Sequence, residues 1–170
     1  MDAQNAVGRC RSPTPNRGAR LDTLAFVLNL ASTGVMIGII WFVQVVHYPL
    51  FSRVGAGGYP AYQAAHSRLT TFVVVPPMLL ELGTGIWLAL RPPPFFPPAL
   101  AWTGLALIAV VWLSTFFLQV PMHNRLARGF DADAHRRLVL GNFVRTAAWT
   151  ARGVIVLVVL ARIAAEAGGG

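Results

Sequence analysis

The first apolar run of the chain, Leu21 to Val46, is the feature that most restricts its fold. A helix needs about 20 predominantly apolar residues to cross the hydrocarbon core of a bilayer, and this run is long enough. It contains one charged residue, Asp22, at its start. We therefore predict a membrane-spanning helix. Pro49 cannot donate a helix hydrogen bond, so we expect this helix to end near Tyr48.

Three further apolar segments follow, separated by proline-rich or charged connections. The predicted spans cover about residues 21–48, 69–90, 99–122 and 139–163. Hydrophobic residues make up 55% of the chain and charged residues 12%, which is too apolar for an ordinary soluble domain. We predict an all-α fold, an integral membrane four-helix bundle, within residues 21–165. Residues 1–20 are expected to be a disordered basic tail, and residues 166–170 a frayed one.

The charge of the chain indicates its partners. The net charge is +8, and all fourteen basic residues are arginines. They flank apolar spans instead of forming one stripe with interleaved aromatic residues, which argues against nucleic acid. The expected partners are the lipid bilayer and a lipophilic small molecule, with a homo-oligomer left open. Cys10 is the single cysteine, so one chain can form neither a disulfide nor a thiolate metal site.

Four spans place both termini on one side of the membrane. The arginines divide evenly between the two sides, and those of the N-terminal tail favour cytoplasmic termini. We predict a multi-pass protein of a bacterial inner membrane. A cleaved signal peptide is the competing interpretation of the N-terminal segment, but the apolar run is longer than a signal core.

Each predicted span carries a line of polar residues at helical spacing, and these faces are expected to point into the bundle. With a rise of about 1.5 Å per residue, Glu81 and Arg152 each lie about 20 Å below the loop side, the side that carries the first and third connections. A carboxylate and a guanidinium at one level in hydrocarbon should form an ion pair. The pair either only joins the second span to the fourth or also binds a proton or a polar substrate group.

A second polar group is expected within about 10 Å of the loop-side surface. Its members are Gln44, His47, His66, Gln119, His123, Asn142 and Arg145. The imidazoles of His47, His66 and His123 could ligate a metal, or two of them could hold a haem; the cofactor is then a transition metal, a haem or none. The competing interpretation is that histidines settle at interfaces because one end is apolar and the other wet.

Smaller features carry expectations of their own. Asp133 is predicted as the N-cap of the fourth helix. His135, between charged neighbours, is expected to be solvated. Gly34 and Gly38 form a small-xxx-small face, which fits packing inside the bundle and dimerisation equally well.

The segment VPMHNRLARG, Val120 to Gly129, followed by LGNFVRTAAW, resembles the anthrone-oxygenase-like family of small four-span membrane proteins. That family often ends its third span in a Pro-x-Asn-Asn-like motif and opens its fourth with an Asn-x-x-Arg-Thr pattern. His123 departs from the motif, standing where the family usually has asparagine. The matching positions are Pro121, Asn124, Asn142, Arg145 and Thr146. The resemblance implies oxidation of a polycyclic phenolic or similar lipophilic aromatic by oxygen, in a pocket near Asn142 and Arg145.

These observations favour an oxidoreductase or oxygenase acting on a lipophilic aromatic or quinone-like substrate in a polar pocket near one membrane surface. The predicted catalytic residues are His47, His66, Asn142 and Arg145. The predicted substrate-binding residues are Gln44, Tyr48, Tyr62, Gln119, Asn124, Glu81 and Arg152. The alternatives are a non-catalytic membrane subunit or assembly protein, and a small carrier that uses the Glu81–Arg152 pair as a relay. The lack of an evident inverted repeat argues against the carrier.

Overall fold

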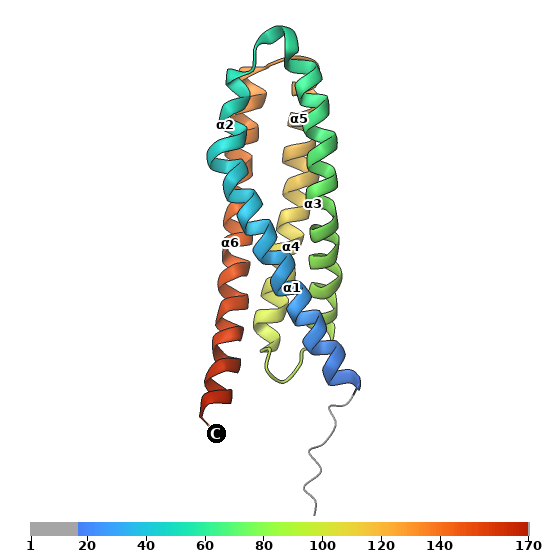
Figure 1. Cartoon of the computed structure of the whole chain (residues 1–170), viewed down its shortest axis with the longest axis vertical. Helices are drawn as coiled ribbons and strands as arrows, with labels where there is room; N and C mark the ends of the chain where they lie inside the picture. The colour runs from blue at the N-terminus through green and yellow to red at the C-terminus, as the bar shows by residue number, and fades with distance from the viewer. Residues whose placement is uncertain (1–16, 170) are drawn as a thin grey trace, which may run out of the picture.

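The computed structural model describes residues 17–169, which form four long helical columns and contain no strand (Figure 1). Each column is long and apolar enough to cross a membrane. The columns are Arg17–Arg53, Ala56–Leu90, Pro98–Leu126 and Ala132–Gly168. Both ends of the described chain lie at the same end of the bundle (Figure 1). The predicted all-α, four-helix membrane bundle is confirmed.

The first column begins earlier and ends later than predicted. It consists of α1 (Arg17–Phe42), the π-helical turn η1 (Val43–His47), the short helix α2 (Tyr48–Leu50) and the 3₁₀ turn η2 (Phe51–Arg53). Residues 1–16, which hold most of the predicted disordered tail and Cys10, lie outside the described residues. The expected helix end near Tyr48 is wrong, because the helical path continues through Pro49.

The third column repeats this arrangement, and the repetition suggests why the prolines are accommodated. It consists of α4 (Pro98–Ser114), the π-helical turn η4 (Thr115–Gln119) and α5 (Val120–Leu126), with Pro121 near the start of α5. In the first and third columns alike, the π turn ends two residues before a proline. A π turn contains one residue more than an α turn. We infer that this wider turn separates the proline ring from the preceding carbonyls.

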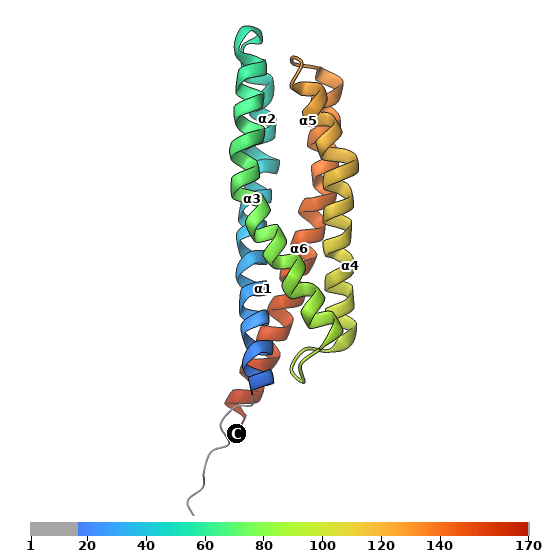
Figure 2. The same ribbon diagram turned by 90° about the vertical axis from the view of Figure 1, so that its right-hand side faces the viewer.

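The second column is one helix with a bend. After the 3₁₀ turn η3 (Ala56–Gly58), α3 (Tyr59–Leu90) runs without a break. Residues 59–68, which precede the predicted second span, are therefore the first part of α3. Pro76 and Pro77 lie inside this helix, and Figure 2 shows α3 changing direction along its length. Proline kinks of this kind are tolerated in membrane helices where neighbours satisfy the freed carbonyls.

The fourth column, α6 (Ala132–Gly168), corrects two predictions. Its N-cap is Asp131 and not Asp133, since Asp131 Oδ1 accepts a hydrogen bond from the Ala134 N–H at 2.9 Å. This bond, and then the Arg125 guanidinium, hold the pKa of the Asp131 carboxyl below its ordinary value. At the other end, residues 166–168 are helical and not frayed.

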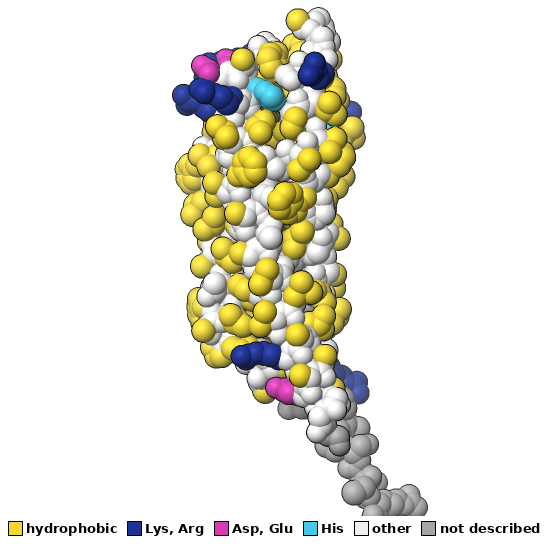
Figure 3. All heavy atoms as spheres, turned by 90° about the vertical axis from the view of Figure 1, so that its left-hand side faces the viewer, with side chains coloured by type: hydrophobic (Ala, Val, Ile, Leu, Met, Phe, Trp, Pro, Cys, Tyr) yellow, Lys and Arg dark blue, Asp and Glu magenta, His cyan; other side chains and the backbone are white. Residues whose placement is uncertain are grey.

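The outside of the bundle is apolar, and its interior contains buried polar side chains together with three hydrophobic clusters. Hydrophobic side chains cover the surface between two charged ends (Figure 3). Phe72 and Phe117 are 73% and 72% exposed, whereas Gln63 and Asn142 are fully buried. Hydrocarbon requires this arrangement because it offers polar groups no hydrogen-bonding partner.

The small-xxx-small face of α1 lies on the outside of the bundle. Gly34 and Gly38 are exposed, and a Cβ atom added at either would meet nothing within 4 Å. Close approach inside the bundle occurs at Gly85 and Gly153 instead, where a Cβ would lie 2.5 Å from an isoleucine side chain. The interpretation of Gly34 and Gly38 as a contact inside the bundle is therefore wrong, and their role in dimerisation remains a prediction.

Candidate functional site

Two buried arginines on α6, Arg145 and Arg152, organise the polar interior in different ways. They are 9% and 3% exposed and lie two helical turns apart. Arg152 has a carboxylate partner, because its Nε lies 2.9 Å from Glu81 Oε1. Arg145 has none within 4.0 Å among residues 17–169. This difference separates a structural ion pair from a candidate binding site.

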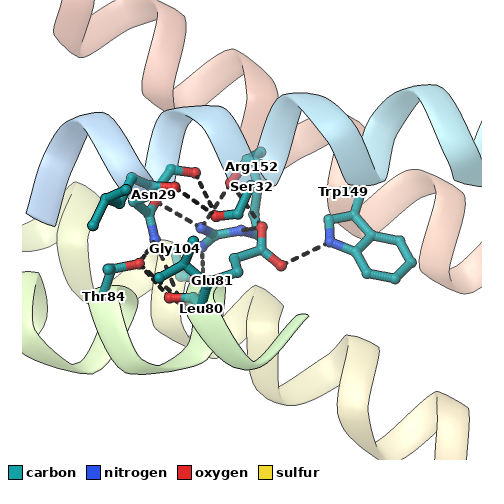
Figure 4. Close-up of polar contacts among 10 residues, drawn as sticks. Asn29, Ser32, Leu80, Glu81, Thr84, Gly104, Trp149 and Arg152 are labelled. Atoms are coloured by element: carbon teal, nitrogen blue, oxygen red, sulfur yellow. Dashed lines mark hydrogen bonds and ion pairs between the residues drawn. The ribbon is translucent and has the colours of Figure 1, made fainter. Parts of the chain in front are cut away.

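The Glu81–Arg152 pair lies in a fully bonded polar cluster (Figure 4). Arg152 donates to the Gly104 carbonyl at 2.6 Å and to Asn29 Oδ1 at 3.0 Å. Glu81 also accepts from Thr33 Oγ1 at 2.7 Å and from Trp149 Nε1 at 2.9 Å. The ion pair predicted from matching depths is confirmed, and its contacts join all four columns.

A cavity of about 220 Å³ lies between α3 and the η4–α5 segment, with α1 and α6 behind it. The Trp149 indole lines this cavity on one side and donates to Glu81 on the other. Glu81 and Arg152, which are among the predicted substrate-binding residues, do not line the cavity and contact it only through Trp149. The lining residues that bear on its chemistry are Tyr48, His66, Thr70, Gln119, His123, Asn124 and Arg145.

Arg145 is held in the cavity wall by neutral oxygens. Its Nε and Nη2 donate to Asn142 Oδ1, the former at 3.1 Å. Longer contacts of 3.3 and 3.4 Å join Nη2 to Tyr48 Oη and Gln119 Oε1. None of these partners carries a negative charge, so the guanidinium remains uncompensated at the wall of the cavity. A buried charge without a counter-charge is costly in hydrocarbon, and such groups mark functional sites.

A hydrogen-bonded chain leads from Arg145 to Gln63. Tyr48 Oη lies 2.9 Å from His123 Nε2, and His123 Nδ1 lies 2.7 Å from Gln63 Nε2. If the Gln63 amide donates to Nδ1, the His123 proton resides on Nε2 and is donated to Tyr48. Tyr48 oxygen then accepts from both His123 and Arg145, and its own hydrogen is free for a ligand.

Sequence reasoning missed Gln63, which is fully buried. Its neighbour on α3, Tyr62, is the predicted substrate-binding residue. Tyr62 packs against Phe51, with ring centroids 5.7 Å apart, and does not line the cavity. The available signal was the i, i+3 spacing from Gln63 to His66, which places both on one helix face.

His47 and His66 form a second contact, with His47 Nε2 lying 2.8 Å from His66 Nδ1. The Thr70 hydroxyl lies 3.1 Å from the same Nδ1. His66 Nε2 has no hydrogen-bonding partner within residues 17–169. If the Nδ1 proton is donated to His47, then Nε2 of His66 is a free base in the wall of the cavity. His47 itself is not among the cavity residues and acts on the cavity through His66.

The three predicted imidazoles converge, but they do not form a metal site in this arrangement. The ring centroids of His47 and His66 are 4.7 Å apart, and those of His66 and His123 are 5.3 Å apart. Within the described part of the chain, no group of three or more His, Cys, Asp or Glu side chains could hold a metal ion. The physical reason is that the facing ring nitrogens bond to each other or to Tyr48 and Gln63.

Other predicted site residues take supporting positions. Gln44 and Asn142 are buried behind Arg145, where Asn142 Nδ2 donates to Gln44 Oε1 at 2.9 Å. Neither lines the cavity, whereas Asn124 does. His135, expected to be solvated, is half-buried, and its Nε2 lies 2.8 Å from the Tyr48 carbonyl oxygen. This contact anchors the backbone of α2, from which Tyr48 projects.

These features describe a multi-pass integral membrane protein with a helical bundle that encloses a cavity, and the wall of this cavity is largely apolar with a few polar groups. No protein-family model, curated protein or solved structure matches it.

Proposed function

We propose that this protein is a membrane oxidoreductase of the oxygenase kind, whose substrate is a lipophilic aromatic with a phenolic, enolic or quinone-like oxygen. The observation that carries the proposal is Arg145, a buried guanidinium without a carboxylate partner among residues 17–169, in the wall of a cavity. The rest of that wall is rich in apolar groups such as Met36, Ile40 and Val74. A ligand that fits both parts is apolar with one electron-rich oxygen.

The wall supplies groups for acid–base chemistry on such a ligand. Arg145 and the Tyr48 hydroxyl are donors that would stabilise an oxyanion, and donors in a water-poor site act more strongly than in water. His66, with its unbonded Nε2, is the proposed base. His123 orients the Tyr48 hydroxyl, and His47 positions His66. Asn142 is a positioning residue, because it acts by holding Arg145.

The proposed reaction uses dioxygen as the oxidant. A methylene carbon that is conjugated to a carbonyl through an aromatic ring, as in an anthrone, loses a proton to His66, and the resulting enolate oxygen is bound by Arg145 and Tyr48. Reaction with dioxygen converts the methylene to a carbonyl, and the second oxygen atom leaves as water, so atoms and electrons balance. The resemblance of Pro121, Asn124 and the Asn142 segment to anthrone-oxygenase-like proteins supports this chemistry.

Oxygen uptake by protein reconstituted in nanodiscs, with a hydroxylated anthrone as substrate, tests the proposal. We expect uptake that is lost in Arg145→Gln and retained in Arg162→Gln, which changes an exposed arginine on the same helix. An absorption spectrum and metal analysis of the same samples identify any haem or transition metal. Wild-type protein without uptake, or uptake that survives Arg145→Gln, would remove the proposal.

The second candidate function, a non-catalytic membrane subunit or assembly protein, is favoured by one observation. Several polar residues bond to each other and not toward the cavity, as Gln44 does with Asn142 and Glu81 with Arg152. This function predicts that a triple alanine variant of His47, His66 and His123 lowers stability and changes no oxygen uptake.

A further inference from the structure

We propose that the cavity opens sideways into the bilayer and takes its ligand from the loop-side leaflet, between α3 and the η4–α5 segment. The chemistry of the ligand rests on the proposed function, while the entry route rests on geometry alone. Three observations carry the route: the exposed residues at the mouth, the closure of the loop-side end, and the change of polarity with depth.

The mouth lies in the lipid-facing surface of the bundle. Thr71 on α3 and Val120 on α5 line the cavity and are also exposed. Phe72 and Phe117, on the same two columns, are among the most exposed aromatic residues of the described chain. Figure 2 shows α3 and the α5 segment diverging toward the loop side. Large exposed aromatic side chains on both columns indicate that the outside of these columns faces hydrocarbon rather than water.

The loop-side end of the cavity is closed by an apolar roof. Phe51 is fully buried, and its ring lies 4.9 Å from that of His66, centroid to centroid. Leu126 and Leu138, both fully buried, belong to the same cluster as Phe51 and Tyr48. A water-soluble ligand approaching from the loops would meet this roof, whereas a ligand dissolved in lipid would meet the mouth between α3 and α5.

The polarity of the wall matches the orientation of an amphiphile in one leaflet. Near the loop side, the wall contains His66, His123 and Asn124; toward the centre of the bundle it contains Met36 and Trp149. From Tyr48 to Met36 the wall extends about 18 Å along the first column, on a rise of about 1.5 Å per residue. Half of a hydrocarbon core is about 15 Å. A molecule with its polar end at the headgroups can therefore enter without turning over.

Thiol labelling tests this route without any ligand. In a Cys10→Ser background, Thr115→Cys places a thiol in the cavity wall, since Thr115 lines the cavity and its hydroxyl lies 3.5 Å from Arg145 Nη1. The guanidinium favours the thiolate that the reagents require. Proteoliposomes are treated with lipid-soluble N-phenylmaleimide or with charged, water-soluble sulfonatoethyl methanethiosulfonate. Val74→Cys on the opposite wall is the second site if Thr115→Cys does not fold.

We expect the maleimide to label the thiol, and the charged reagent to label it about a hundredfold more slowly, because a charge seldom enters hydrocarbon. Thr71→Trp should slow maleimide labelling about tenfold, as much as a barrier of 1.4 kcal/mol would. Leu79→Trp, on an exposed residue of α3 outside the cavity wall, should leave it unchanged. Phe51→Ala should open the roof and admit the charged reagent.

Two outcomes would overturn the lateral route. Fast labelling by the charged reagent in the Thr115→Cys protein, without Phe51→Ala, means that the cavity opens to water. Labelling by neither reagent, at both thiol positions, means that it is sealed. The labelling assay uses neither substrate nor dioxygen. The lateral route can therefore be refuted while oxygen uptake persists, and it can be supported while no oxygen uptake is found.

Discussion

The same substitution at two positions of one helix, Arg145→Met and Arg152→Met, should have very different effects on stability. Arg152→Met leaves the Glu81 carboxylate 1% exposed and without its counter-charge. Removal of one partner of a buried ion pair costs about 3 to 5 kcal/mol. The Thr33 and Trp149 hydrogen bonds to Glu81 remain, and they are too weak to replace a guanidinium.

Arg145→Met leaves no carboxylate behind, since Arg145 has no such partner among residues 17–169. Removal of the charge regains about 2.5 to 3.5 kcal/mol on insertion scales. The lost hydrogen bonds to Asn142 come from a charged donor and cost about 1.5 to 3 kcal/mol together, and the long contacts to Gln119 and Tyr48 cost about 0.5 kcal/mol each. The two contributions nearly cancel, and we expect stability within about 1 kcal/mol of wild type.

Equilibrium unfolding in mixed micelles, followed by circular dichroism during titration with dodecyl sulfate, measures both changes. Arg162→Met is the matched control, since Arg162 is exposed near the end of the same helix. Equal losses for Arg145→Met and Arg152→Met would refute the reasoning, because they would show that the carboxylate partner does not decide the cost. The Arg145→Met variant should also lose oxygen uptake. This result is expected if Arg145 serves function and adds nothing to the free energy of unfolding.

Three further predictions concern single contacts. Trp149→Phe removes the indole donor to Glu81 and should destabilise the bundle by about 1.5 to 3 kcal/mol in the same titration; an unchanged midpoint contradicts this. Tyr48→Phe should keep stability within about 1 kcal/mol of wild type and lower oxygen uptake, and normal uptake would exclude Tyr48 from the reaction. The pKa of Asp131 is lowered on folding, so its contribution to stability is complete above its unfolded value of 3.8 and is lost as pH falls through the folded value. Asp131→Asn keeps a capping side chain but should abolish the loss of stability at acid pH, measured in thermal melts. If the variant keeps the wild-type pH dependence, the loss of stability belongs to other groups.

Much of the fold could be predicted because bilayer thickness imposes a length on each helix. The four apolar runs were long enough to span, and four spans were found. Helical rise alone placed Glu81 and Arg152 at one level, where they pair. The boundaries were less accurate, since Pro49 was expected outside the first helix and lies within its column, and the third column continues past residue 122 to Leu126.

The candidate site was predicted as a group of residues but not as an arrangement. The rise of a helix determines how deep a residue lies, while the contacts of a side chain depend also on the rotation of the helix about its axis. A π turn adds one residue and rotates everything beyond it by about 100°. The turns η1 and η4 lie next to Tyr48 and His123, so no regular helical periodicity could assign their partners.

The pattern of apolar and polar residues predicts the membrane bundle, the depth of its polar residues and the Glu81–Arg152 pair, because these features depend on hydrophobicity and on distance along a helix. Which polar groups satisfy each other, and which remain available, depends instead on how the four columns pack. Packing places Gln44 against Asn142 and brings His123 within hydrogen-bonding distance of Gln63. It leaves Arg145 at the cavity wall without a carboxylate partner among residues 17–169. Contacts between columns determine this pairing, because the packing of neighbouring side chains limits which partners a polar side chain can reach.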